Sequence, residues 1–373
     1  SATLRARVLG REPGAVTGFW TSEELRYTTG ADTASFHAGR MGARLQQDYG
    51  GGRWGIRASG WLDRWRPAAD SAGAPPGQSR LQLHGSVLDT LLLGAMRLGL
   101  EAGAHYDGWE AYPSVSAELS RVAGSLRFHV AGRLAGQAAS WFDRYGFGAF
   151  AEGAGDGAGL VGLVEAGLER RGKVFDVGLT VFGNQTRRAR AFYEVGEDTA
   201  RAFVVGSPVT RVGAALDLGW RRDAARGFYL TVQPTAVHFL SDGAAPNGVL
   251  LSQTLPEVFA SGRLGARYLL FKGDLDLDIH LDGRAWSRMR SRTLHPATGL
   301  LVVPRSDDPW IGPSGTLDVV VEAGVRTATI FVAYYNVLAS STGGGVYEGT
   351  LLVPTYPLPE RSFRLGVFWP IQD

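Results

Sequence analysis

The stretch Gly-Asp-Leu-Asp-Leu-Asp-Ile-His-Leu-Asp, residues 273–282, decides the fold. Its aliphatic residues alternate without interruption with Asp and His, which is the period of a β-strand with one apolar and one charged face. Residues 257–270 alternate in the same way. Folding the two segments about a two-residue loop at Lys272–Gly273 places opposite charges together on one face and apolar residues on the other. The predicted neighbours are Arg267 with Asp278, Arg263 with Asp282, and Leu264 with Leu281.

The same alternation recurs along the whole chain, and the connections between the alternating segments are of two kinds. Short turns are expected near residues 49–52, 88–90, 122–125, 171–173, 222–227, 271–274 and 326–328. Between them lie long polar or Gly/Pro-rich stretches, at 66–79, 135–157, 185–208, 241–255, 291–315 and 339–360, with 105–112 as a shorter member. Tight turns at one rim and long loops at the other are typical of a bacterial outer-membrane barrel.

A soluble β-sandwich or propeller would also alternate, but two features favour a membrane barrel. The alternating segments are longer than the usual strand of about five or six residues. Aromatic residues also gather at the strand ends, as the two interfaces of a bilayer require. The residues that we expect in such aromatic girdles include Trp54, Trp220, Phe271, Trp286 and Trp369.

We therefore predict one all-β domain over residues 1–373, a transmembrane antiparallel up-and-down β-barrel of about sixteen strands, with fourteen or eighteen as alternatives. Residues 1–14 form either an N-terminal extension or an extra strand. The start of the sequence has no apolar signal segment, so we expect any signal peptide to have been removed. Zero Cys excludes disulfides and thiolate metal sites, and a net charge of +2 gives no reason to expect a nucleic-acid partner.

The region from about residue 256 to the C-terminus resembles the barrel end of TonB-dependent receptors. The resemblance rests on Ala266-Arg267-Tyr268, on the Leu-Asp-Leu-Asp strand, on the aromatic-rich segment 330–338, and on the Pro-Leu-Pro-Glu-Arg segment that leads into the last strand. It implies an outer-membrane location and a barrel architecture. That family carries a plug domain ahead of its barrel, whereas strand-like sequence begins here almost at once, so we expect a plugless relative.

The charged face of residues 273–282 is the sharpest candidate site. A ladder of carboxylates either binds Ca²⁺ or lines a cation path, or it pairs with arginines across the hairpin. Same-face neighbours along a strand are about 6.6–6.8 Å apart, which favours pairing. We predict a charge network in the lumen and expect no metal, no cofactor and no catalytic residues, so the chain is not predicted to be an enzyme. The network comprises Arg263, Arg267, Asp276, Asp278, His280 and Asp282.

The leading functional hypothesis is a porin-like channel for passive transport of small solutes. The alternatives are a structural subunit that scaffolds a larger outer-membrane complex, and a plugless relative of a TonB-dependent transporter. The expected partners are outer-membrane lipid, lipopolysaccharide and other envelope proteins. The long loops would be extracellular, and the short turns and the C-terminus periplasmic. A constriction loop is predicted at 135–157, with Trp141, Phe142, Asp143, Arg144 and Tyr145.

Overall fold

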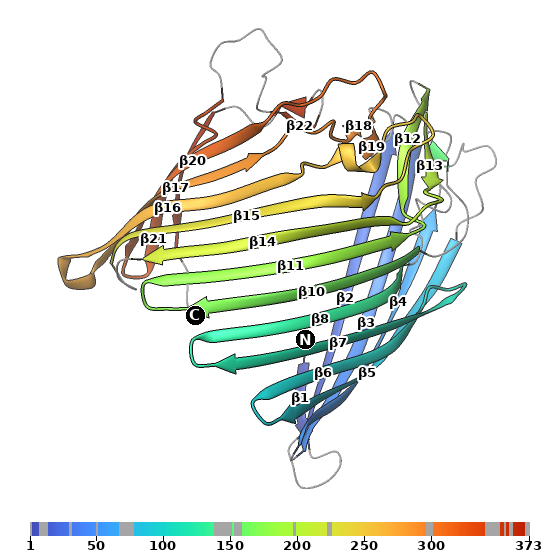
Figure 1. Cartoon of the computed structure of the whole chain (residues 1–373), viewed down its shortest axis with the longest axis horizontal. Helices are drawn as coiled ribbons and strands as arrows, with labels where there is room; N and C mark the ends of the chain where they lie inside the picture. Colours follow the sequence, from blue (N-terminus) through green and yellow to red (C-terminus); the bar gives the residue numbers. More distant parts are fainter. Residues whose placement is uncertain are drawn as a thin grey trace.

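The chain is built almost entirely of antiparallel β-strands (Figure 1). The computed structural model describes residues 2–6, 14–29, 32–49, 51–66, 78–137, 151–152, 159–196, 199–221, 226–295, 301–339, 351–353, 356–357 and 361–369. Two short 3-10 helices, η1 (Leu251–Thr254) and η2 (Phe271–Gly273), lie in connections. Neither these helices nor any other described part of the chain forms a helix long and apolar enough to cross a membrane.

One large sheet of 17 strands contains most of the chain. Its strands are β1 (Ala2–Ala6), β2 (Gly14–Thr29), β3 (Asp32–Tyr49), β4 (Gly52–Arg66), β5 (Gln78–Leu93), β6 (Met96–Tyr106), β7 (Ala111–Ala123), β8 (Leu126–Gln137), β10 (Gly159–Arg171), β11 (Phe175–Arg187), β14 (Val209–Arg221), β15 (Gly227–Ser241), β16 (Val258–Leu270), β17 (Leu275–Trp286), β20 (Ser314–Val325), β21 (Ala328–Tyr335) and β24 (Ser362–Phe368).

Consecutive strands in this order pair with each other, always antiparallel. The strands from β2 to β24 are the sixteen predicted segments, and β1 adds a short strand on the edge of β2. The predicted number is therefore not confirmed. Within the described residues no backbone pairing joins β24 to β1 or β2, so closure of the sheet into a barrel stays a prediction.

The predicted hairpin about residues 272–273 has the expected register. Arg263 lies opposite Asp282, Arg267 opposite Asp278, and Leu264 opposite Leu281. The expected two-residue loop is wrong, because pairing stops at Leu270 and Leu275 and η2 fills the turn. Phe271, Lys272 and Gly273 all have positive φ angles, of 53°, 62° and 102°, which a regular ladder does not accommodate.

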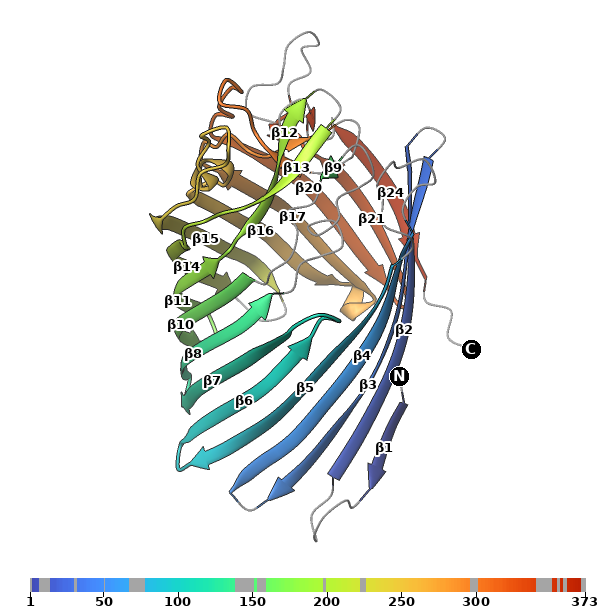
Figure 2. The same cartoon turned by 90° about the vertical axis from the view of Figure 1, so that its right-hand side faces the viewer.

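The sheet is strongly curved, so that β2–β5 lie across from β14–β17 (Figure 2). Its two faces differ as the alternation predicts. Apolar side chains such as Ile56 and Leu264 are 45% and 48% exposed, whereas Asp63 and His280 on the opposite face are only 2% and 3% exposed. Because the polar side chains are the less exposed ones, we assign them to the concave inner face of the curved sheet. The apolar side chains then lie on the convex outer face.

A second, smaller sheet occupies the end of the molecule that carries the long connections (Figure 1). Its strands are β18 (Thr293–Leu294), β19 (Leu301–Val303), β12 (Arg190–Gly196), β13 (Thr199–Val204) and β9 (Ala151–Glu152), while β22 (Leu351–Val353) pairs with β23 (Tyr356–Pro357). A cluster of apolar side chains packs this five-stranded sheet against the ends of the long strands. The cluster comprises Ala191, Phe203, Val205, Val209, Ala245, Val249, Leu251 and Val303. Sequence alternation alone did not predict this packed structure.

Candidate functional site: a charge network on the inner face

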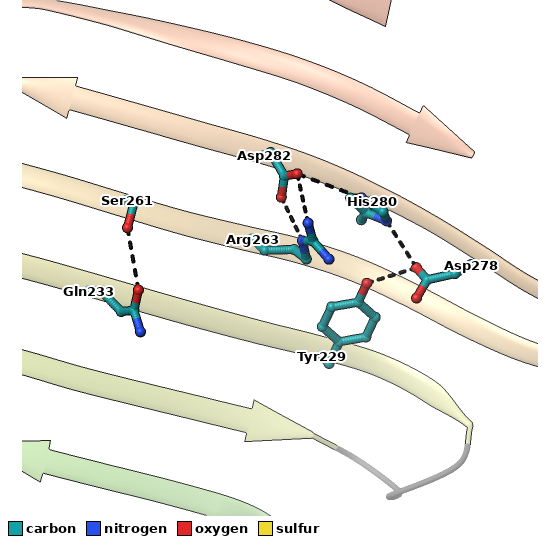
Figure 3. Close-up of polar contacts among 7 residues, drawn as sticks. All are labelled: Tyr229, Gln233, Ser261, Arg263, Asp278, His280 and Asp282. Atoms are coloured by element: carbon teal, nitrogen blue, oxygen red, sulfur yellow. Dashed lines mark hydrogen bonds and ion pairs between the residues drawn. The ribbon is translucent and has the colours of Figure 1, made fainter. Parts of the chain in front are cut away.

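Polar contacts link inner-face side chains of β15, β16 and β17 (Figure 3). One two-pronged pair joins the neighbouring strands β16 and β17. Arg263 donates from Nε to Oδ1 of Asp282 at 2.6 Å and from Nη2 to Oδ2 at 2.9 Å. This two-pronged geometry matches the planar guanidinium to the planar carboxylate. The side chains are 46% and 30% exposed, so water screens part of the attraction.

Arg267 does not bond the residue directly opposite it. Although its backbone partner is Asp278, its guanidinium reaches diagonally to Asp276, donating from Nε to Oδ1 at 2.8 Å and from Nη2 to Oδ2. The expected Arg267–Asp278 side-chain pair is therefore replaced by a diagonal one. Diagonal neighbours of an antiparallel pair lie within reach of a long side chain, and this choice leaves Asp278 to other partners.

Asp278 instead joins Tyr229 on β15 to His280 on β17. The Tyr229 hydroxyl donates to Oδ1 of Asp278 at 2.7 Å, and Nδ1 of His280 lies 3.2 Å from the same oxygen. On its other side, Nε2 of His280 lies 3.7 Å from Oδ2 of Asp282. Four of the six predicted residues are thus linked through His280, which lies between two carboxylates, while Arg267 and Asp276 form a separate pair on the same face.

Tyr229 was not predicted, and Gly265 explains how it reaches the network. The row Tyr229, Gly265 and His280 crosses three strands in direct register. Because residue 265 has no side chain, the phenol ring of Tyr229 lies over it and reaches β17. A Cβ atom at this position would come within 2.5 Å of Cζ of Tyr229 and 2.8 Å of Cβ of His280. An inner-face glycine opposite an aromatic residue was the available signal in the sequence.

The same pairing of an inner-face aromatic or imidazole ring with a glycine on the next strand recurs along the sheet. In each pair the two residues are direct backbone partners, and the ring lies where the missing Cβ would be. The pairs are His129 with Gly167, Phe182 with Gly213, Tyr229 with Gly265, and Phe331 with Gly366. The high glycine content of the strands is therefore explained partly by ring packing.

The carboxylates of the network accept hydrogen bonds from protein side chains and are not arranged around a common point. Asp276 and Asp282 each accept two bonds from an arginine, and Asp278 accepts one from Tyr229. The described residues contain no group of three or more potential ligands placed to hold a metal ion. The arrangement supports the ion-pair interpretation of this charged face over the Ca²⁺ interpretation.

A second inner-face cluster is more deeply buried. Asp63 on β4 accepts bonds at Oδ2 from Nε and Nη2 of Arg80 on β5, at 3.2 and 2.8 Å, and from Gln82. The turn between β6 and β7 covers this cluster, because the ring centroid of Trp109 lies 5.4 Å from Cζ of Arg80. Asp107 holds the turn by accepting bonds from the backbone N–H groups of Trp109 and Glu110. Neither Asp63 nor Arg80 belongs to the charge network predicted from the sequence.

A polar recess of about 440 Å³ opens on the inner face of β4–β8 and β10. Its lining mixes positive and negative side chains, among them Arg57, Arg97, Glu101, Glu118, Arg133 and Glu165. Arg57 Nη1 lies 3.6 Å from Oε1 of Glu101, which also accepts a bond from Ser86 at 2.6 Å. The inner face therefore presents charges of both signs rather than a single potential.

Four of the five expected girdle residues lie on or beside the outer face. Trp54 and Trp220 occupy the alternate positions of their strands that face outward. Phe271 and Trp369 are 75% and 68% exposed. Trp286 differs, because it faces the same inner side of β17 as His280 and Asp282 and is only 6% exposed. Its position at the strand end was predicted correctly, but its face was not considered. The expected constriction residues Trp141, Phe142, Asp143, Arg144 and Tyr145 lie outside the described residues.

Comparison with solved structures matches the fold to iron and copper transporters and siderophore receptors. No family model and no curated protein matches the chain. Among solved structures, the FrpB iron transporter from Neisseria meningitidis superimposes with a TM-score of 0.72 at 13% identity, covering 97% of this chain and 62% of FrpB. The siderophore receptor PirA from Acinetobacter baumannii gives 0.69 at 10% identity, covering 95% and 60%.

The copper transporter OprC gives a TM-score of 0.64 at 12% identity, covering 95% of this chain and 62% of OprC. The chain thus spans about three fifths of the length of these structures. Identities this low establish the fold alone. The resemblance of the C-terminal third extends to nearly the whole chain, which shares the fold of the TonB-dependent outer-membrane receptors.

Proposed function

We propose that the chain forms a closed outer-membrane barrel that passes small solutes across the membrane without an energy source. The observation that carries the proposal is the division of the sheet into two faces. Apolar side chains lie exposed on the convex face, as lipid contact requires, and paired charges line the concave face. In this arrangement the long connections face the cell exterior and the short turns face the periplasm.

Closure would join β24 to β2. Within the described residues β1 pairs only with residues 14–18 of β2, so residues 19–29 offer an edge to β24. Joining them would give an even ring of sixteen strands, as bacterial barrels favour. The chain has no Cys, so single cysteines placed on β24 and on residues 19–29 of β2 give an unambiguous test. We expect a disulfide cross-link in the folded protein, and its absence at every register would contradict closure at this seam.

The transport proposal predicts single-channel conductance for the purified, folded full-length chain in a planar lipid bilayer. Because charges of both signs pair along the inner face, we expect weak ion selectivity. Steady conductance steps would support the proposal. A preparation that shows the heat-dependent gel mobility of a folded barrel and never conducts would refute it.

A matched pair of variants tests whether ions pass along the inner face. Glu322 lies on the inner face of β20, whereas Asp274 lies in the short β16–β17 turn. Glu322→Lys and Asp274→Lys change the net charge equally. We expect only Glu322→Lys to shift the reversal potential in a salt gradient clearly toward anions. Equal shifts for the two variants would place the conducting path elsewhere.

The comparisons favour a second candidate, energy-dependent transport, because the similar structures are described as iron and copper transporters and siderophore receptors. Uptake of the transported solute by intact cells distinguishes energy-dependent transport from passive transport. Passive transport persists when the proton-motive force is collapsed, whereas energy-dependent transport stops. A folded barrel that neither conducts nor supports uptake, and that co-purifies with a stoichiometric envelope protein, would instead indicate a scaffold role.

A further inference from the structure

Three arginines occur at alternate positions just after β17, at the end of the molecule that carries the long connections. They are Arg288, Arg290 and Arg292, in the sequence Ser-Arg-Met-Arg-Ser-Arg at 287–292. The residue between the first two, Met289, is 2% exposed and exchanges both backbone hydrogen bonds with Ile311, at 3.0 and 2.8 Å. The N–H of Arg290 also donates to the carbonyl of Gln253 at 2.7 Å. The backbone that carries the arginines is therefore fixed.

The first two guanidinium groups share one aromatic ring. Cζ of Arg288 lies 5.4 Å from the ring centroid of Trp310, and Cζ of Arg290 lies 5.2 Å from it. Trp310 precedes Ile311, so the Met289–Ile311 bridge sets this contact. The ring is 46% exposed and therefore available to a ligand. Cation–π contact orients both guanidinium groups but does not neutralise either charge.

Among the described residues, no carboxylate forms an ion pair with any of the three arginines. Among the described residues, the buried Nε of Arg290 has no hydrogen-bond partner. Burial lowers the pKa of the Arg292 guanidinium. Arg305, two residues after β19, shows the contrast. It bonds Glu194 through Nε at 3.1 Å and through Nη2, and this bond raises its pKa.

We infer that Arg288, Arg290 and Trp310 form a binding site for a ligand that carries phosphate groups. Arginine binds phosphate oxygens through two parallel N–H donors, and two arginines held side by side on one ring suit a ligand with more than one negative charge. The Trp310 ring offers an adjacent apolar platform. The site itself does not depend on the proposed transport, but the orientation proposed above would place it on the cell exterior.

Calorimetric titration of the folded full-length chain with inorganic pyrophosphate at physiological ionic strength tests the site. We expect saturable binding that weakens about tenfold in Arg288→Gln and in Arg290→Gln, since each loses a charge-assisted contact. Arg305→Gln is the matched control, with the same loss of charge in the same connection, and should change the affinity less than about twofold. Heat-dependent gel mobility verifies that each variant is folded.

Two results would overturn the inference: no saturable binding by the unmodified chain, or equal weakening in Arg305→Gln, which would show only diffuse charge attraction. The phosphate has two natural sources, a soluble solute or the head group of a lipid. Vesicles that contain bis-phosphorylated lipid A will displace pyrophosphate if the site serves lipid, and will not if it serves a soluble solute. Loss of conductance with binding intact would refute the transport proposal and leave this site standing.

Discussion

Substituting Gly265 by Ala is the sharpest test of how the inner face is assembled. The new methyl carbon would come within 2.5 Å of both Cζ and the hydroxyl oxygen of Tyr229 and within 2.8 Å of Cβ of His280. The ring must therefore move, and its hydrogen bond to Asp278 must break. Overpacking costs about 1–3 kcal/mol, and a hydrogen bond to a charged group contributes about 1.5–3 kcal/mol. Because Tyr229 is only partly buried, we expect a loss of about 2–4 kcal/mol in the free energy of unfolding.

Urea unfolding of the detergent-folded chain, followed by tryptophan fluorescence, measures this loss. Gly99→Ala is the matched control, because Gly99 also lies in an inner-face position but its Cβ would meet nothing closer than 3.9 Å. We expect it to change stability by no more than about 0.5 kcal/mol. Tyr229→Phe, which keeps the ring and removes the hydroxyl, should cost about 1.5 kcal/mol, the low end of the range for a hydrogen bond to a charged group, because Tyr229 is only partly buried.

A double-mutant cycle isolates the contact between the two residues. If the ring and the new methyl group collide, Gly265→Ala should cost much less in a Tyr229→Ala background, with a coupling of about 1–3 kcal/mol. Additive costs in the cycle, or equal costs for Gly265→Ala and Gly99→Ala, would refute the ring-over-glycine explanation.

Two further predictions concern burial. Asp63→Asn should cost about 3–5 kcal/mol because it removes a carboxylate that is bonded to a buried guanidinium, whereas Asp282→Asn breaks a half-exposed pair and should cost about 1 kcal/mol or less. Urea titrations of the two variants compare these costs, and equal values would contradict the burial argument. Val303→Asp should open the apolar cluster of the long connections to trypsin while the sheet stays folded, because Val303 is 1% exposed. Leu301→Asp, at a position 49% exposed on the same strand, is the control, and equal cleavage of the two would argue against the cluster.

Alternation in the sequence was sufficient to predict the strands and the pairing of neighbours. Period two assigns residues to faces, and opposite charges at matching distances from residues 272–273 specify the register of β16 and β17. The same reasoning placed the six charged residues on one face of β16 and β17. It also identified the two kinds of connection, because tight turns and long polar stretches differ plainly in composition.

What the sequence did not reveal depends on contacts that cross more than one strand or fold within a connection. Tyr229 reaches Asp278 over the intervening strand, and Arg267 chooses a diagonal partner, so nearest-neighbour pairing misses both. Trp286 was assigned by its position at a strand end, and its parity on β17 places it on the inner face instead. The long connections were expected to be loops, but short strands from distant segments pair there, as Phe192 does with Val302.

The glycines that lie beneath aromatic rings also restrict how the strands can be assembled. A slip of one residue between neighbouring strands exposes the wrong face and is excluded by alternation alone. A slip of two residues preserves every face, so alternation cannot exclude it. Such a slip of β15 against β16 would set Tyr229 opposite Arg263 or Arg267 instead of Gly265, and the ring would have no space. The strands thus carry two superimposed patterns, one that selects the face and one that selects the register.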